Sequence, residues 1–324
     1  MGDREIVVET LYSAISSGTE KAIYSAADAD VYSSDGWCRY PCRMGYSGVG
    51  RIITKGRSVV EFNIADRVLG MLGHESHRVL NVDEMMGRAW SNRPVMAARV
   101  DISDQAAAFV RIAGIAMTPI QLLRPESYSV VGIWGLGIVG NLVAQLLRSA
   151  GHKIVGVDPD PFRRNVAESV GIEVVLDPED TDFGQHLADL APDGFRAIVD
   201  TVGDPTVTVS LPTHLGMRGQ LVLMTHWRSE SKINGSALVR EIFRKGLSVH
   251  GGLEYGPGSA RWQSWSLLQY EKWRKVEELI SRGMLNIERL VSVVARPEDH
   301  VYIYDGLDRG TSNTLGILID WRRA

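Results

Sequence analysis

The sequence predicts an α/β protein in which a doubly wound parallel sheet is joined to a second, β-rich domain. From Ser129 onward, apolar strand-like runs alternate with amphipathic segments, which is typical of a parallel sheet with helices on its faces. Before residue 104 the chain consists of short strand-like runs joined by turns. The 324 residues are enough for about two domains. We expect the parallel sheet over 113–254 and the β-rich domain over 1–112 together with 255–324.

The composition is ordinary for a soluble globular protein, with 44% hydrophobic and 23% charged residues. The net charge is −4 and no basic stripe is present, so we expect a small-molecule substrate and no nucleic acid. Cys38 and Cys42 are the two cysteines, too few for a disulfide framework or a four-thiolate zinc site. Because the first residues also lack the pattern of a signal peptide, the sequence favours a cytoplasmic location.

An uncharged segment over 127–147 is long enough to suggest a membrane span. Four glycines within 132–140 favour instead a buried strand, a turn and a helix, so we expect no membrane association.

In the β-rich domain, the sequence predicts a strand at 5–12, a turn and short helix over 13–25, and a loop at 28–45. Two further strands follow at 48–56 and 66–72, and an alanine-rich helical stretch covers 104–123. A long helix ending at Gly283 opens the C-terminal part, and the tail over 290–321 is expected to return to strands.

In the parallel sheet, the predicted strands and helices alternate regularly. The predicted strands lie at 129–135, 152–158, 173–177, 195–203, 219–225 and 246–252, and the intervening helices at 141–151, 161–171, 184–192, 205–218 and 236–245.

The strongest motif is a glycine fingerprint between the first of these strands and its helix. The segment Gly135-Leu136-Gly137-Ile138-Val139-Gly140 follows the apolar run from Val130 to Trp134. In a Rossmann unit the first glycine permits the tight turn, the second lets a diphosphate approach the backbone, and the third lets helix and strand pack closely. The diphosphate would bind to backbone N–H groups at the helix N-terminus. The alternative is a glycine-rich turn that binds no nucleotide.

An acidic residue supports the nucleotide interpretation. Asp158 ends the next strand, 21 residues after Gly137, where a carboxylate would accept hydrogen bonds from the adenosine ribose and repel a 2′-phosphate. NAD(H) is therefore favoured over NADP(H), although Arg163 and Arg164 follow closely and count against that preference. The alternative role for Asp158 is that of a helix-capping carboxylate. His226, at the carboxyl end of a later strand, is expected to flank the nicotinamide, the alternative being an ordinary loop residue.

Several further segments resemble the medium-chain dehydrogenase/reductase superfamily, the alcohol dehydrogenase-like proteins. Residues 15–20 (ISSGTE) resemble the family's I-C-G-T-D turn, 44–50 (MGYSGVG) its G-H-E-G-x-G segment, and 65–68 (ADRV) its G-D-R-V segment. Residues 199–203 (VDTVG), which include Val202, resemble the V-D-x-x-G strand end, and 243–252 the last strand of the nucleotide fold, often the dimer edge. The SSGTE and LIDWR pieces also resemble bacteriochlorophyllide dehydrogenase-like members.

This resemblance implies a Rossmann domain plus a GroES-like catalytic domain, here shortened at its N-terminus, and a homodimer. It also implies where a catalytic zinc would be held. The matching positions carry Ser17, Tyr46 and either Arg111 or Ile112, which cannot build a zinc site, so we expect no zinc.

Without a metal, hydrogen-bond donors must stabilise the developing alkoxide and supply its proton. By resemblance, Thr19 occupies the hydroxyl position that relays the proton, and Tyr46 could donate to a substrate oxygen. If residues 74–77 form a strand, His74 and His77 point to opposite faces, and one could act as acid or base. The alternatives are a turn hydroxyl for Thr19 and an aromatic wall for Tyr46.

The expected function is NAD(H)-dependent interconversion of a secondary alcohol and a ketone on a polar metabolite. A second hypothesis is reduction of an activated C=C bond, as in zinc-free quinone or enoyl reductases of the superfamily. A third is a dinucleotide-binding sensor without catalysis.

Overall fold

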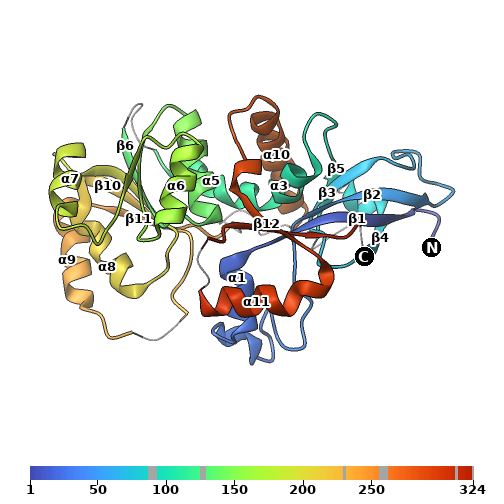
Figure 1. Cartoon of the computed structure of the whole chain (residues 1–324), viewed down its shortest axis with the longest axis horizontal. Helices are drawn as coiled ribbons and strands as arrows, with labels where there is room; N and C mark the ends of the chain where they lie inside the picture. The colour runs from blue at the N-terminus through green and yellow to red at the C-terminus, as the bar shows by residue number, and fades with distance from the viewer. Residues whose placement is uncertain (87–92, 125–128, 229–230, 255–261, 311–312, 323–324) are drawn as a thin grey trace. The chain divides into compact units, whose positions relative to one another are not determined.

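The computed structural model describes residues 1–86, 93–124, 129–228, 231–254, 262–310 and 313–322, with the backbone alone described over 262–267. The chain divides into two compact units (Figure 1). Unit 1 comprises Met1–Gly114 and Tyr255–Ala324, and unit 2 comprises Ile115–Glu254.

Unit 2 contains a six-stranded sheet of order β11-β10-β9-β6-β7-β8, in which all neighbouring strands are parallel. The strands are β6 (Val130–Trp134), β7 (Lys153–Val157), β8 (Val174–Leu176), β9 (Phe195–Asp200), β10 (Leu215–Leu223) and β11 (Ser248–Gly251). The chain runs outward from β6 to β8 and then returns to the other side of β6 with β9. This is the doubly wound Rossmann topology, so the predicted fold class is confirmed.

Helices connect these strands and cover the sheet (Figure 1). They are α4 (Thr118–Leu122), α5 (Ile138–Ser149), α6 (Pro161–Ser169), α7 (Phe183–Leu190), α8 (Pro205–His214) and α9 (Gly235–Lys245). Asp160 and Asp204 each accept a hydrogen bond from a first-turn N–H group and so cap α6 and α8. The core of the unit packs Trp134 of β6 edge-on against Phe195 of β9.

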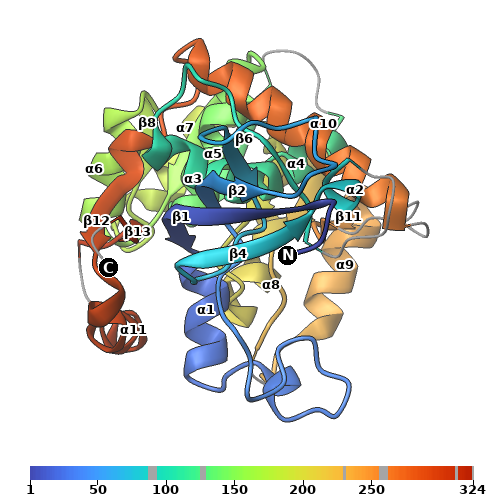
Figure 2. The ribbon, with the colours of Figure 1, turned by 90° about the vertical axis from the view of Figure 1, so that its right-hand side faces the viewer.

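Unit 1 is built on a sheet of order β12-β13-β1-β2-β3-β5, with β4 paired to β1. Its strands are β1 (Glu5–Ile15), β2 (Gly48–Lys55), β3 (Arg67–Gly70), β4 (His77–Asn81), β5 (Val95–Ala97), β12 (Val291–Ala295) and β13 (Gly316–Asp320). All pairs are antiparallel except β12 with β13. The long strand β1 is central because it pairs with β2, β4 and β13, and Figure 2 shows β4 beside it.

The helices of unit 1 are α1 (Ser17–Tyr24), α2 (Val82–Met85), α3 (Asp104–Ala116), α10 (Trp262–Ser281) and α11 (His300–Arg309), with short 3₁₀ turns at Ala29–Val31, Glu288–Leu290 and Pro297–Asp299. The expectation that the whole tail forms strands is wrong over α11. Ile303, Tyr304 and Leu307 lie on one helical face and pack into the core around β13, and Gly310 ends the helix in the left-handed conformation. This face outweighs the alternating pattern of the segment HVYIYD.

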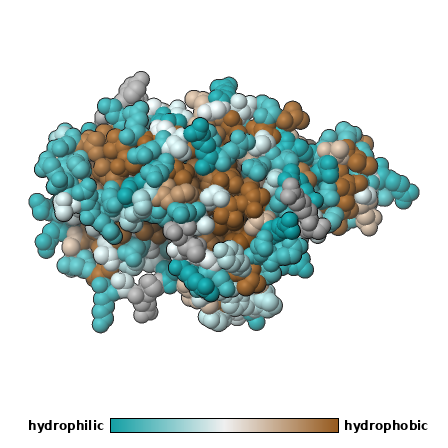
Figure 3. All heavy atoms as spheres, viewed as in Figure 1, coloured by the Kyte–Doolittle hydropathy of each residue, from teal (hydrophilic) through white to brown (hydrophobic). Residues whose placement is uncertain are grey.

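None of the helices within the described residues is long and apolar enough to cross a membrane. Over its described residues, 129–147, the uncharged segment that suggested a span forms β6, a glycine turn and part of α5. Hydrophilic side chains cover much of the face shown in Figure 3, with apolar patches between them.

Candidate functional site

The glycine loop of unit 2 joins β6 to α5, at the point where the strand order reverses. Gly135 has a φ of +88°, a conformation that L side chains rarely adopt. A Cβ atom at Gly140 would lie 1.9 Å from the carbonyl oxygen of Gly135. The first and third glycines are therefore required by the turn and by the close approach of helix and loop.

The middle glycine differs because its surroundings are open. A Cβ atom at Gly137 would meet no described protein atom within 4 Å, and no described side chain caps the N-terminus of α5 at this residue. The first helical turn, with the amides of Ile138, Val139 and Gly140, has no internal acceptor for these N–H groups. Such a terminus attracts anions, so the loop fits a bound diphosphate.

Asp158 is only 2% exposed and holds the glycine loop from the end of β7. One of its carboxylate oxygens accepts the N–H of Leu136 at 2.7 Å, and the other accepts the N–H of Asp160 at 2.9 Å. The guanidinium of Arg163 lies 3.6 Å from the carboxylate. The predicted ribose acceptor thus already bonds to two backbone amides, and further acceptance would use its remaining lone pairs.

The end of β9 meets the same loop. The hydroxyl of Thr201 donates to the carbonyl oxygens of Trp134 and Gly135 at 3.0 and 2.9 Å. Asp200 is buried and accepts the N–H of Val202 at 2.9 Å, which fixes the turn that leaves Val202 45% exposed. His226 is exposed beyond the end of β10.

In unit 1 a buried carboxylate collects donors from several elements. Glu20 of α1 is 1% exposed and accepts the N–H of Ser16 at 2.8 Å and the phenol of Tyr304 at 2.5 Å. Burial by itself raises the pKa of Glu20, but the partner His74 and the donors Tyr304 and Ser16 outweigh it and hold the pKa below its usual value. The carboxylate is therefore kept ionised inside the fold.

His74 is the imidazole that reaches this carboxylate. Its Nε2 lies 2.9 Å from Glu20, and its Nδ1 lies 2.8 Å from the hydroxyl of Ser13. The indole N–H of Trp321 donates to the same Ser13 oxygen at 2.8 Å. The strand considered over 74–77 does not form, because β4 begins only at His77, which is exposed, while His74 lies in the preceding turn with both ring nitrogens bonded.

Tyr46, the second residue predicted to handle protons, lies next to this carboxylate. Its phenol donates to the hydroxyl of Ser16, and the guanidinium of Arg111 lies 5.5 Å from the centre of its ring. Burial raises the pKa of Tyr46, against the lowering influence of Ser16, Arg111 and Thr19. The structure thus brings Thr19, Tyr46 and the Glu20–His74 pair into one polar cluster within unit 1.

The positions matched to the zinc ligands of related enzymes do not fit a zinc ion. Ser17 offers a hydroxyl, Tyr46 a phenol that stays protonated, and Arg111 a cation, whereas structural and catalytic zinc sites use thiolate, imidazole and carboxylate. Within the described part of the chain, no group of three or more His, Cys, Asp or Glu side chains could hold a metal ion.

Sequence reasoning missed part of this cluster. Glu20 and Trp321 entered only as letters in motifs, and Tyr304 and Ser13 were not singled out. Trp321 and Ser13 are 308 residues apart in the chain, and Tyr304 and Glu20 are 284 apart, so no local pattern connects them. The one available signal was the acidic residue at the end of ISSGTE.

Comparison with known proteins identifies related sequences. Residues 139–269 match the family model described as zinc-binding dehydrogenase. The chain is 23% identical over 229 residues to (R,R)-butanediol dehydrogenase of Bacillus subtilis, covering 64% of this chain and 65% of that protein. It is 23% identical over 331 residues to L-threonine 3-dehydrogenase of Aliivibrio salmonicida, covering 93% of this chain and 90% of that protein.

Solved structures share the fold at low sequence identity. The crystal structure of 2R,3R-butanediol dehydrogenase from Bacillus subtilis matches with a TM-score of 0.76 and 17% identity over 99% of this chain and 93% of that one. The rspB alcohol dehydrogenase from Escherichia coli, complexed with NADH, gives 0.75 and 17% over 98% and 92%. Escherichia coli quinone oxidoreductase, complexed with NADPH, gives 0.74 and 18% over 98% and 92%.

Proposed function

The chain belongs to the medium-chain dehydrogenase/reductase superfamily and is an oxidoreductase of it, and on this premise we propose that it interconverts a secondary alcohol and a ketone of a polar metabolite with NAD(H) and without zinc. The observation that carries the proposal is the pairing of two features. Unit 2 has a glycine loop open to a diphosphate, and unit 1 has proton donors at the positions matched to metal ligands.

The residues of unit 2 bind and orient the dinucleotide in this proposal. Gly135, Gly137 and Gly140 shape the loop, and the amides of Leu136, Ile138 and Val139 belong to it, with the Leu136 amide held by Asp158. The exposed Val202 and His226 follow the ends of neighbouring strands, where the nicotinamide half binds in sheets of this kind. When bound, NADH supplies the hydride.

The residues of unit 1 hold and move the proton. The substrate oxygen takes the phenolic proton of Tyr46, with the Thr19 hydroxyl as a second donor beside it. His74 contributes through Glu20, because both of its ring nitrogens are occupied in the buried network. A zinc ion has no role in this scheme, since the matched side chains are a hydroxyl, a phenol and a guanidinium.

Transfer of a labelled hydride tests the reaction. Protein incubated with [4-²H]NADH and a panel of polar ketones should give alcohols that carry deuterium at the carbinol carbon. Elemental analysis should find zinc far below one ion per chain in the active preparation. Stoichiometric zinc, with activity lost on its removal and restored on its return, would reject the metal-free mechanism.

The alternative hypothesis, reduction of an activated C=C bond, is supported by the structural likeness to a quinone oxidoreductase. Deuterium on the β-carbon of an enone, rather than on a carbinol carbon, would favour it. A third outcome, tight NADH binding with no transfer to any acceptor, would favour a sensor.

The preference for NADH over NADPH depends on two opposing charges. The carboxylate of Asp158 disfavours a 2′-phosphate. The guanidinium of Arg163 lies 3.6 Å from that carboxylate and partly compensates its negative charge. We expect wild-type protein to bind NADH more tightly than NADPH, Asp158→Asn to reduce the difference and Arg163→Ala to increase it. Fluorescence titration measures the dissociation constants of NADH and NADPH. Equal values in the wild type would reject the role of Asp158 in selecting NADH.

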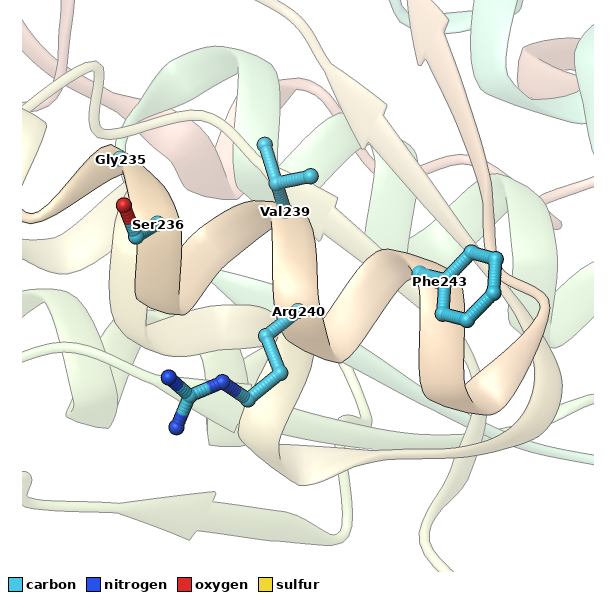
Figure 4. A pocket seen from close by; sticks show the side chains of 5 residues that line it. All are labelled: Gly235, Ser236, Val239, Arg240 and Phe243. Atoms are coloured by element: carbon cyan, nitrogen blue, oxygen red, sulfur yellow. The ribbon is translucent and has the colours of Figure 1, made fainter.

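A second copy of the chain is the proposed partner. β11 is an edge strand of the unit 2 sheet and its Val249 is 42% exposed. On the adjoining α9, Val239 and Phe243 are 62% and 86% exposed, and Figure 4 shows them on successive turns with Arg240 extending the other way. An unpaired strand edge beside apolar side chains favours association of identical sheets.

Light scattering after size exclusion should therefore find a dimer. Val249→Pro on the edge strand and Phe243→Glu on α9 should each shift it toward the monomer, whereas Val60→Glu, at an exposed position of unit 1, should not. A wild-type monomer at micromolar concentration would reject this proposal.

A further inference from the structure

Arg111 is a charged residue in an otherwise apolar part of α3. The helix from Gln105 to Ala116 contains no other ionisable residue, and the side chains around Arg111 in sequence, from Ala106 to Ala113, are buried. Arg111 itself is 4% exposed. Burying a guanidinium is costly unless its charge is used or compensated, so its position beside a specific group is informative.

That group is the ring of Tyr46. The guanidinium carbon of Arg111 lies 5.5 Å from the ring centre, on the face of the ring. The other groups facing Tyr46 come from α1 and its N-cap: the hydroxyls of Ser16 and Thr19, and the carboxylate of Glu20. Arg111 and the two hydroxyls favour a negative charge on the phenol oxygen, and Glu20 opposes it.

We infer that Arg111 is the positioning residue for proton transfer from Tyr46, its positive charge stabilising the Tyr46 phenolate that forms during ketone reduction. The inference deepens the proposed function and rests on it for its catalytic meaning. Its physical content, a buried cation that favours the ionised phenol, stands on the geometry of unit 1 alone.

The step balances with the cofactor already proposed. The carbonyl carbon of the ketone accepts the hydride of NADH, its C=O π bond breaks, and the electron pair moves to the oxygen. That oxygen takes the proton of Tyr46, so the phenolic O–H bond breaks and its electron pair remains on the Tyr46 oxygen. The ketone is reduced, NADH is oxidised, and the phenolate next to Arg111 then recovers a proton from water.

Burial shows why such a cation is needed. Burial raises the pKa of Tyr46 and keeps the phenol protonated at neutral pH, which suits a proton donor but makes loss of the proton costly. Arg111 acts against that cost without touching the oxygen itself, because its guanidinium lies over the ring. A neutral side chain at 111 would leave the proton in place but make its transfer harder.

A titration without substrate or cofactor tests the inference. 3-Chlorotyrosine, which ionises at lower pH than tyrosine, is incorporated at position 46 and followed by ultraviolet absorbance in the full-length protein. In Arg111→Met its pKa should rise by about 1–3 units relative to the parent protein, the usual effect of removing a nearby opposite charge. Arg111→Lys, which keeps the charge, should restore most of the difference.

Two controls separate this effect from general disturbance. Arg67→Met removes another guanidinium of unit 1, one paired with Asp104 at 2.8 Å, and should leave the titration at position 46 unchanged. 3-Chlorotyrosine at Tyr302, which is 84% exposed, should not respond to Arg111→Met. If Arg111→Met fails to fold, Arg111→Gln gives the same comparison with a polar side chain retained.

An unchanged titration at position 46, or the same value for Arg111→Met and Arg111→Lys, would overturn the inference. Ketone reduction should slow about tenfold or more in Arg111→Met, because one pKa unit corresponds to a factor of ten. The dissociation constant of NADH should stay unchanged. A shifted titration in a protein that reduces no ketone would reject the proposed function and leave the Arg111–Tyr46 interaction standing.

Discussion

The glycine loop of unit 2 and the Glu20 cluster of unit 1 build their chemistry in different ways. The loop uses consecutive backbone amides from Leu136 to Gly140, and its principal side-chain partner, Asp158, is only 22 residues from Leu136. The cluster uses side chains from β1, α1, α11 and the C-terminal end of the chain, up to 308 residues apart. The first leaves backbone donors for a ligand, whereas in the second the imidazole and hydroxyl groups around Glu20 bond to the carboxylate and to one another.

This difference determines how each region fails. An added side chain in the loop fills space that the backbone or the ligand needs, whereas a removed side chain in the cluster leaves buried partners without a bond.

Removing the central carboxylate should have the largest effect on stability. Glu20→Ala leaves His74, Tyr304 and the amide of Ser16 without their shared acceptor, and breaking a buried pair of this kind costs about 3–5 kcal/mol. Urea unfolding followed by circular dichroism measures the loss. Glu9→Ala, which removes a half-exposed partner of Arg51, should cost less than about 1 kcal/mol.

The same carboxylate gives a pH dependence. Because the folded state lowers the pKa of Glu20, its contribution to stability is complete above the usual value of 4.5 and is lost as the pH falls through the lowered pKa. Glu20→Gln should therefore flatten the fall in stability on acidification below pH 4.5. An acid profile identical to that of the wild type would mean that the carboxylate is not ionised in the folded protein.

The same added methyl group should lower stability at one glycine of the motif and cofactor affinity at another. In Gly140→Ala the new Cβ meets the carbonyl oxygen of Gly135 at 1.9 Å, so the protein should lose about 1–3 kcal/mol of stability. In Gly137→Ala the Cβ enters open space, so stability should be nearly unchanged while the dissociation constant of NADH rises about tenfold, or ~1.4 kcal/mol. Thermal unfolding and cofactor titration distinguish the two, and wild-type NADH affinity in Gly137→Ala would argue against a diphosphate at the loop.

The smallest expected effect comes from a half-buried histidine of unit 2. Burial and the nearby Lys245 lower the pKa of His214, which stacks on Trp134 with ring centres 5.7 Å apart. The unfolded chain therefore binds a proton more readily, and stability should fall as the pH drops below about 6.5. His214→Gln should remove the contribution of this histidine to the decrease in stability. That contribution is ~1.4 kcal/mol for each unit by which the pKa is lowered. His186→Gln, at an exposed position of α7, should leave the profile unchanged.

The sequence predicted most of the fold because its signals are local. The alternation of apolar runs and amphipathic segments gave the doubly wound sheet, and the spacing of Gly135, Gly137, Gly140 and Asp158 indicated the nucleotide loop. The prediction failed at residues 300–305, where a strand-like pattern and a helical pattern are both present. The segment HVYIYD alternates like a strand, yet its helical face packs against β13, and only the packing decides between them.

By itself the sequence determined the residue types: glycines that a tight turn requires, and a hydroxyl, a phenol and a cation at Ser17, Tyr46 and Arg111, none of which suits zinc. Tertiary structure decided which of these groups meet. It turned His74 inward onto Glu20, brought Tyr304 and Trp321 back from the far end of the chain, and placed Arg111 over Tyr46. The reason is physical: backbone conformation follows from neighbouring residues, whereas the partners of a buried charge are chosen by whichever elements the core packs around it.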